Sequence, residues 1–291
     1  MMVMKMLMMR ITLLCLALPC LANTCTTARD PARISVAGGS LTEILYRLGA
    51  EKQIVAVDST SNYPPEASKL PSIGYIRNIS AEGILSLYPT LILGEDDIGP
   101  PAVLAQVHAM GIDIEILTEE HSAQGIIDKI RCIGSIIGES GKANELIKQF
   151  MLPRIDELNI LTKKGRLANK KILFILSLQA GSPIVGGTGT SAGGLISMTG
   201  SSNAMADVAG WKATSTEAII SAAPDFIVIS RRGLNTFGEL DEMRLHPALR
   251  FTPAAKAGNI VVMDGMQMLG FGPRTLDAAV TLSRRFSSTK P

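Results

Sequence analysis

The segment SAEGILSLYPT at residues 80–90 returns, with substitutions, as STEAIISAAPD at residues 215–225. Serine, glutamate, isoleucine, serine and proline coincide in the two copies at a constant offset of 135 residues. In each copy the leading serine predicts the N-cap of a short helix, and the proline ends that helix before an apolar strand. A common strand–helix solution reached twice would also produce this match, but duplication of a whole lobe explains more of it.

Apolar strand-like runs alternate with helical patterns on both sides of the repeat. Predicted strands lie at residues 33–36, 54–57, 90–93, 112–117, 171–178, 226–229 and 260–263. Predicted helices in the first half lie at residues 41–48, 100–110 and 122–137. Alternation of this kind indicates α/β layers with mainly parallel sheets.

A polar and apolar stretch at residues 140–164 separates the two halves. Its apolar side chains recur at helical spacing, and these are Ile147, Phe150, Met151, Ile155, Leu158 and Leu161. Pro153 is an irregularity that favours a kink. We therefore expect one long helix at residues 139–165 between an N-terminal lobe at 23–138 and a C-terminal lobe at 166–291. Small-molecule sites commonly form in a cleft between such lobes.

The composition is that of a globular protein. The 291 residues are 46% hydrophobic and 19% charged, with a formal net charge of only +2. A protein that binds nucleic acid through phosphate contacts would normally be more cationic, so we expect no nucleic-acid partner.

Residues 1–22 have the pattern of an export signal. Lys5 and Arg10 form a positive region, an apolar run follows at residues 11–18, and Ala22 ends a small-residue cleavage pattern. A short membrane anchor and a lipoprotein modified at Cys20 are the alternatives, although a proline before the modified cysteine fits the second poorly. The signal predicts a periplasmic location.

Two cysteines, Cys25 and Cys132, remain after removal of the signal. In an exported chain they could form one disulfide, and free buried thiols are an equal alternative. The absence of a CxxC motif and the scatter of the histidines argue against a zinc or multi-histidine site. The three histidines are His108, His121 and His246.

A glycine-rich segment at residues 187–193 partly matches two catalytic or nucleotide motifs. Residues 189–193 fit G-x-S-x-G, with Asp225 and His246 following in the order of a hydrolase triad. Residues 187–192 also resemble a dinucleotide loop. Neither match follows directly on a firm strand, so we expect a helix start or a wall of the cleft and no enzyme activity.

Tyr75 is the strongest candidate for ligand binding. It lies in the segment Gly74-Tyr75-Ile76-Arg77, which we expect to be a loop at the edge of a lobe. Tyrosinate is a hard anionic ligand of ferric iron, and haem can be held by an axial tyrosine. A free phenol has a pKa of about 10, and a guanidinium two residues away could hydrogen-bond to the charged form and favour it. A packed surface ring is the plainer alternative.

Three segments carry a resemblance to a known family. The run at residues 74–91, the segment Asp96-Asp97-Ile98-Gly99-Pro100-Pro101 and the later LGFGPRT at residues 269–275 closely resemble the periplasmic haem-binding proteins of bacterial haem ABC importers. The resemblance covers about residues 31–286. It implies a class III periplasmic binding protein, in which one long interdomain α-helix joins two Rossmann-like lobes.

The resemblance also implies roles for single residues. Tyr75 would be the axial ligand of a ferric haem b with Arg77 in support, and Glu82 and Glu217 would dock on the two subunits of an ABC permease that works with its ATPase. A second ligand is not evident, so we expect one five-coordinate haem and a monomeric receptor. A ferric-siderophore or cobalamin receptor of the same transporter class is the alternative.

The haem propionates need cationic partners. Arg231 and Arg232 follow the predicted strand that ends at residue 229 or 230, and ligands usually bind at the carboxyl ends of such strands. We therefore assign the propionates to these two arginines and a structural role to Arg274.

Overall fold

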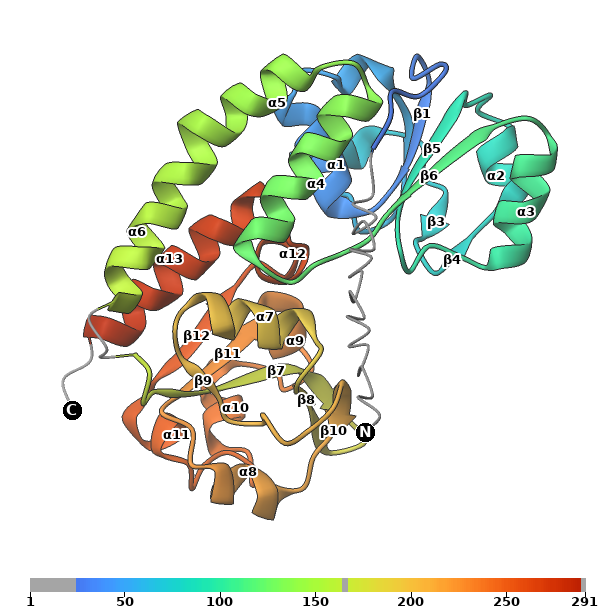
Figure 1. Ribbon diagram of the computed structural model, residues 1–291. Helices are drawn as coiled ribbons and strands as arrows, with labels where there is room; N and C mark the ends of the chain where they lie inside the picture. Colours follow the sequence, from blue (N-terminus) through green and yellow to red (C-terminus); the bar gives the residue numbers. More distant parts are fainter. Residues whose placement is uncertain (1–24, 164–166, 289–291) are drawn as a thin grey trace, which may run out of the picture.

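The computed structural model describes residues 25–163 and 167–288, which form two α/β lobes (Figure 1). The predicted fold class, two α/β lobes with a helical connection, is confirmed. The predicted signal at residues 1–22 lies outside the described residues. Of the helices in the described part, none combines the length and the apolar character that a bilayer span requires.

The N-terminal lobe is built on a four-stranded parallel sheet with the order β2-β1-β5-β6. Its elements are β1 (Ile34–Ala37), α1 (Gly39–Arg47), η1 (Glu51–Gln53), β2 (Ile54–Val57), η2 (Ala67–Lys69), β3 (Gly74–Tyr75), β4 (Asn78–Ile79), α2 (Ala81–Leu85), β5 (Leu91–Glu95), α3 (Pro101–Ala109), β6 (Asp113–Leu117) and α4 (Ala123–Ile136). Every residue of β1 and β5 is buried, as expected for central strands covered on both faces.

The C-terminal lobe has a sheet with the order β10-β8-β7-β11-β12, and β9 also pairs with β7. Its elements are β7 (Lys171–Gln179), β8 (Ser182–Gly186), α7 (Ser191–Met198), β9 (Ser202–Asn203), β10 (Trp211–Ala213), α8 (Thr216–Ala222), β11 (Phe226–Ser230), α9 (Arg231–Leu234), α10 (Leu240–Leu245), α11 (Pro253–Ala257), β12 (Ile260–Met263), α12 (Gly265–Leu269) and α13 (Pro273–Ser288). The sheet is less parallel than the sequence suggests because β8 and β10 run antiparallel. Ala180 and Gly181, both with positive φ, form the tight turn that folds β8 back on β7.

The two lobes are joined by consecutive helical segments, α5 (Ser140–Leu146), the π-helical η3 (Ile147–Met151) and α6 (Leu152–Lys163). The π segment is a departure from a regular α-helix. Pro153 supplies the physical reason, because it has no amide hydrogen for the normal bond to the preceding turn. Helix α13 packs along α6, so the C-terminal helix reinforces the connection (Figure 1).

One apolar core cluster runs through both lobes and the connection between them. It includes Ile34 and Leu91 from the N-terminal sheet, Met151 from the connection, and Phe226 and Phe286 from the C-terminal lobe. The lobes therefore share buried apolar surface and are more than two units tied by a helix.

Candidate functional site

Tyr75 and Arg77 lie on a short β-hairpin and not in an open loop as the sequence suggests. β3 and β4 pair antiparallel, with Gly74 opposite Ile79 and Tyr75 opposite Asn78. Gly74 has a φ of 96°, which favours glycine at the start of the hairpin. In Figure 1 the hairpin lies at the end of the N-terminal lobe that is nearer to the C-terminal lobe.

Buried isoleucines determine which way the hairpin faces. Ile73, Ile76 and Ile79 are 2%, 3% and 4% exposed and belong to one apolar cluster of the lobe. Tyr75, which lies between Ile73 and Ile76 in the sequence, is 43% exposed. The hairpin thus turns its isoleucines into the lobe and presents the tyrosine ring to the outside.

Main-chain hydrogen bonds hold the hairpin on both sides. The amide of Ser59 donates to the carbonyl of Gly74 at 2.8 Å. On the other side, the Gly99 amide donates to the Ile76 carbonyl, and the Ile79 amide donates to the Gly99 carbonyl, both at 2.9 Å. Two segments outside the hairpin, at Ser59 and at Gly99, thereby place the tyrosine.

Arg77 connects the tyrosine to an acidic residue. Its Nη1 donates to the Tyr75 hydroxyl oxygen at 2.5 Å, which is the hydrogen bond that the sequence suggested. Its Nη2 lies 2.6 Å from Oδ2 of Asp97, and the guanidinium carbon lies 5.7 Å from the centre of the Tyr75 ring. A positive charge is therefore held beside the phenol oxygen.

Asp97 is a site residue that sequence reasoning left without a role. The signal was present, since Asp97 belongs to the segment at residues 96–101 that carries the family resemblance. Its Oδ1 atom is buried and has no hydrogen-bond partner among the described residues. Asp97 fixes the guanidinium of Arg77 and offsets part of its charge.

Tyr75, Arg77 and Asp97 suit a metal whose other ligands are supplied by a bound cofactor. Nowhere in residues 25–163 and 167–288 do three or more His, Cys, Asp or Glu side chains gather into a metal-binding group. Tyr75 contributes one oxygen donor, and the Arg77 guanidinium lies within hydrogen-bond distance of it. A single axial ligand of this kind fits the iron of a tetrapyrrole.

Arg231 and Arg232 are placed at the carboxyl end of β11, in the first turn of α9. Both are exposed, and neither forms an ion pair with another residue of the described part. The hydroxyl of Ser230 caps α9 by accepting from the Gly233 amide at 2.9 Å. The two guanidinium groups can therefore bind an anion. Within the described residues, no hydrogen bond joins either of them to Tyr75.

Glu82 and Glu217 occupy the same position in the two copies of the repeat. Each is exposed in the first turn of its helix, α2 or α8. The pKa of Glu217 is lowered by a hydrogen bond from its own amide and by the Ser215 hydroxyl. Both carboxylates therefore face solvent, one on each lobe.

The glycine-rich segment before α7 is a helix start. Ser191 is the first residue of α7, and four residues separate it from the end of β8, so it does not sit on a strand-to-helix elbow. Thr190 caps the helix by accepting from the Gly193 amide at 3.0 Å. A side chain at Gly187 would collide with the carbonyl of Val208, so close packing accounts for that glycine.

Cys25 and Cys132 form a disulfide, so the alternative of free thiols is wrong. The bond ties the start of the described chain to α4. Beside it, an open hollow of about 1190 Å³ extends along β6 and α4. None of the candidate ligand-binding residues lines this hollow.

Two solved structures of high similarity are described as periplasmic heme-binding proteins. RhuT from Roseiflexus sp. RS-1, a periplasmic heme-binding protein in apo form, has 36% identity and a TM-score of 0.81, covering 87% of this chain and 97% of that one. BhuT, described as a periplasmic heme-binding protein in complex with two hemes, has 33% identity and a TM-score of 0.83, with coverage of 88% and 97%.

Relatives found by sequence include proteins that are named for another ligand or for none. YvrC of Bacillus subtilis, an uncharacterized ABC transporter substrate-binding lipoprotein, is 28% identical over 208 residues, which span 70% of this chain but only 65% of that protein. A vitamin B12-binding protein of Pectobacterium atrosepticum is 27% identical over 208 residues, or 70% of this chain and 74% of its own length.

The family assignment rests on the whole two-lobed unit. A model of the family described as "Periplasmic binding protein" matches residues 34–266, which extend from β1 into α12. The relatives are binding proteins by name, and YvrC is named as a substrate-binding lipoprotein of an ABC transporter. The chain is a member of the periplasmic binding protein family.

Proposed function

We propose that this protein binds ferric haem between its two lobes, with Tyr75 as the axial ligand, and delivers it to an ABC permease. The observation that carries the proposal is the half-exposed phenol of Tyr75 with the Arg77 guanidinium at 2.5 Å from its oxygen. The similarity to RhuT and BhuT over almost their full length supports haem as the ligand. Capture and handover require no chemical change, so the protein acts as a receptor and not as an enzyme.

Cobalamin is the second candidate, because curated relatives are named vitamin B12-binding proteins. The site favours haem on chemical grounds. A hard phenolate oxygen prefers ferric iron, and the one described residue that presents such an oxygen with a cation at hydrogen-bond distance is Tyr75. A ferric siderophore is the third member of this group of ligands.

The test is a titration of the purified mature protein with hemin, followed by absorption spectroscopy. We expect saturation at one haem per chain with the spectrum of a high-spin ferric tyrosinate. Tyr75→Phe removes only the oxygen, so it should weaken binding by about 100-fold, or about 2.7 kcal/mol, and abolish that spectrum. The end point also distinguishes one bound haem from two, which is the number in the BhuT complex.

Tyr88→Phe is the matched control. Tyr88 belongs to the same lobe and is 78% exposed, so removal of its hydroxyl should leave haem binding unchanged. Tight binding that survives in Tyr75→Phe would mean a haem receptor with another ligand. No saturable binding of hemin, with binding of cyanocobalamin, would move the protein to the second candidate.

Arg231 and Arg232 are proposed to hold the propionates. Their exposure and freedom from ion pairs within the described chain support this role. Replacing both with glutamine should weaken binding of hemin about tenfold, or about 1.4 kcal/mol, and leave the iron spectrum unchanged. A hemin ester without free carboxylates should bind both proteins equally if the assignment is right.

Docking on the permease is proposed to use Glu82 and Glu217. Their matched positions, one on each lobe, suit a partner made of two equivalent subunits. Glu82→Gln with Glu217→Gln should abolish stimulation of the reconstituted transporter's ATPase and leave haem affinity unchanged. Glu66→Gln, an exposed carboxylate outside the repeat, is the control. Loss of haem affinity in the double variant would contradict the assignment.

The receptor is proposed to work as a periplasmic monomer carrying a single haem b. The predicted signal at residues 1–22 and the disulfide support export to an oxidising compartment. Contact with the permease would release the haem by displacing or protonating the phenolate of Tyr75.

A further inference from the structure

The segment Gly270–Arg274, part of the family resemblance, lies against the other lobe. Phe271 is fully buried, has a φ of 46°, and stacks on His121 of the N-terminal lobe with 4.9 Å between the ring centres. A positive φ is costly for a bulky residue, so the surrounding contacts hold the ring in this place. His121 is thus part of the contact between the lobes.

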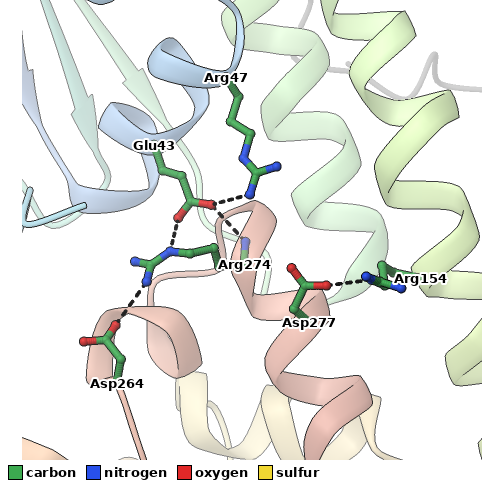
Figure 2. Close-up of polar contacts among 6 residues, drawn as sticks. All are labelled: Glu43, Arg47, Arg154, Asp264, Arg274 and Asp277. Atoms are coloured by element: carbon green, nitrogen blue, oxygen red, sulfur yellow. Dashed lines mark hydrogen bonds and ion pairs between the residues drawn. The ribbon is translucent and has the colours of Figure 1, made fainter. Parts of the chain in front are cut away.

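Arg274 makes the polar part of the same contact (Figure 2). Its amide donates to Oε1 of Glu43 at 3.0 Å and its Nε donates to Oε2 at 2.9 Å. Its guanidinium also lies 3.7 Å from the centre of the Tyr63 ring. Glu43 and Tyr63 belong to the N-terminal lobe, whereas Arg274 is the second residue of α13.

The backbones of the two lobes meet closely around this pair. A Cβ atom at Gly272 would lie 3.2 Å from Cβ of Ser40 in α1. A Cβ atom at Gly39 would lie 2.8 Å from Cε of Met266 in α12. The two lobes are therefore in close contact at these points, and a change in the angle between them would have to separate packed atoms.

Glu43 needs its partner because it is out of contact with water. Its side chain is 5% exposed, and burial raises its pKa while Arg274 opposes the rise. Arg47 is the next cation, at 3.8 Å. A buried carboxylate that lost the guanidinium would be left largely unpaired, because the Nε atom and the amide of Arg274 are its two hydrogen-bond donors.

We propose that Glu43, Tyr63 and His121 with Phe271, Gly272 and Arg274 form an interlobe clasp that sets the spacing of the binding site. The helical connection alone would allow bending at its π segment near Pro153. The clasp is a second attachment between the lobes, made by side chains outside the helical connection. It holds the lobe that carries Tyr75 at a fixed distance from the lobe that carries Arg231 and Arg232. Its consequence for haem rests on the function proposed above; its effect on the lobes does not.

The clasp can be tested without ligand by measuring the distance between the lobes. Ser86 and Ser221 are exposed and occupy the same position in the two copies of the repeat. Spin labels on Ser86→Cys and Ser221→Cys, with the native disulfide intact, report one interlobe distance by double electron–electron resonance. We expect a single narrow distribution in the apo protein and at least a twofold broader one in Arg274→Gln.

Two further variants guard against a simple loss of folding. Glu43→Gln removes the carboxylate and keeps the arginine. The double variant Glu43→Gln with Arg274→Gln removes both charges, so no buried charge is left unpaired. The double variant should therefore fold and still show the broad distance distribution. Arg131→Gln is the control, because Arg131 pairs with Asp128 on the surface of a single helix at 3.0 Å. Its distribution should stay narrow.

The haem measurement separates positioning from direct contact. If the clasp sets the spacing, the double variant keeps the tyrosinate spectrum but loses about tenfold in affinity for hemin, mainly through faster dissociation. A weaker affinity with an unchanged narrow distance distribution would mean that Arg274 touches the ligand, and would overturn the proposal. Narrow distributions in every variant would overturn it as well, whichever ligand the protein binds.

Discussion

The helix and strand that follow Ser80 and those that follow Ser215 are built alike. Each serine caps its helix by accepting from the amide three residues on. Tyr88 and Ala223, at the same place in the two copies, have φ values of 47° and 48° in front of the proline. β5 and β11 then begin at the same offset, and each lies between a parallel strand on either side.

The two lobes differ in the segment that precedes this unit. In the N-terminal lobe β2 lies along β1, and the chain then forms the hairpin with Tyr75. In the C-terminal lobe β9 pairs with only the start of β7, and β8 and β10 take the rest of that edge. The duplicated unit is therefore a scaffold, and in the N-terminal lobe the hairpin before it carries Tyr75.

Removal of the disulfide should have the largest effect on stability, and the N-terminal lobe should lose more protection than the C-terminal lobe. The bond closes 107 residues of the N-terminal lobe, so Cys25→Ser with Cys132→Ser should lower the free energy of unfolding by about 3–4 kcal/mol. Hydrogen exchange should show the loss in β1 and β5, while β7 and β11 keep their protection.

The exchange rates show whether the two lobes unfold separately or as one unit. If exchange accelerates equally in all four strands, the lobes unfold as one unit and the shared apolar cluster dominates their stability. The Ser86→Ala variant, far from either cysteine in sequence and exposed, controls for the effect of substitution itself.

The equivalence of the repeats can be tested at their buried isoleucines. Ile84 and Ile219 occupy the same position and both are 0% exposed. Truncation to alanine should cost about 3 kcal/mol in either lobe, because each change leaves a similar cavity under a similar helix. Urea unfolding measures both.

Ile160→Ala is the control, since that side chain is 60% exposed on the connecting helix and should cost less than about 0.5 kcal/mol. A difference of more than about 1.5 kcal/mol between Ile84→Ala and Ile219→Ala would show that the two helices pack differently despite their common pattern.

Local patterns determine what could be predicted from the sequence. The repeat, the two lobes and most strands follow from hydrophobic period and capping residues, and the strand predicted at residues 226–229 is Phe226–Ser230 in the structure. The contact of Tyr75 with Arg77 was also accessible, because the two residues are neighbours on a hairpin.

Contacts between distant segments could not be predicted in this way. Asp97 reaches Arg77 from the next loop, and Arg274 reaches Glu43 across 231 residues. Such pairs depend on how the lobes pack, and a linear pattern carries no information about that packing. The pairing of the cysteines was open for the same reason.

A buried carboxyl at the end of β5 should make the stability of the N-terminal lobe depend on pH. Glu95 is 8% exposed, accepts from the Ser40 hydroxyl at 2.6 Å, and has its pKa raised to about 8, mainly by burial. The folded state therefore holds a proton that the unfolded state has released above about pH 5. Stability should fall as the pH rises, by about 2 kcal/mol between pH 6 and pH 8.

Glu95→Gln should remove this slope, measured as the free energy of unfolding in urea across the same range. The nearby ion pair of Lys129 with Glu119, at 2.6 Å, remains in the variant and gives the background. The counterpart of Glu95 in the other lobe is Ser230, which does not titrate, so Ser230→Ala should leave the slope as it is. A slope that survives in Glu95→Gln would assign it to another group.

The smallest effect should come from the two caps, and it gives the finest test of the duplication. The hydroxyls of Ser80 and Ser215 accept from the amides of Gly83 and Ala218 at 3.2 Å and 3.3 Å. Replacing either serine with alanine should cost about 1 kcal/mol, because one amide at the start of each helix loses its partner. Aspartate at the same positions should restore the stability, since its carboxylate can accept the same bond. If only one lobe responds, the two helix starts have diverged in energy while keeping the same geometry.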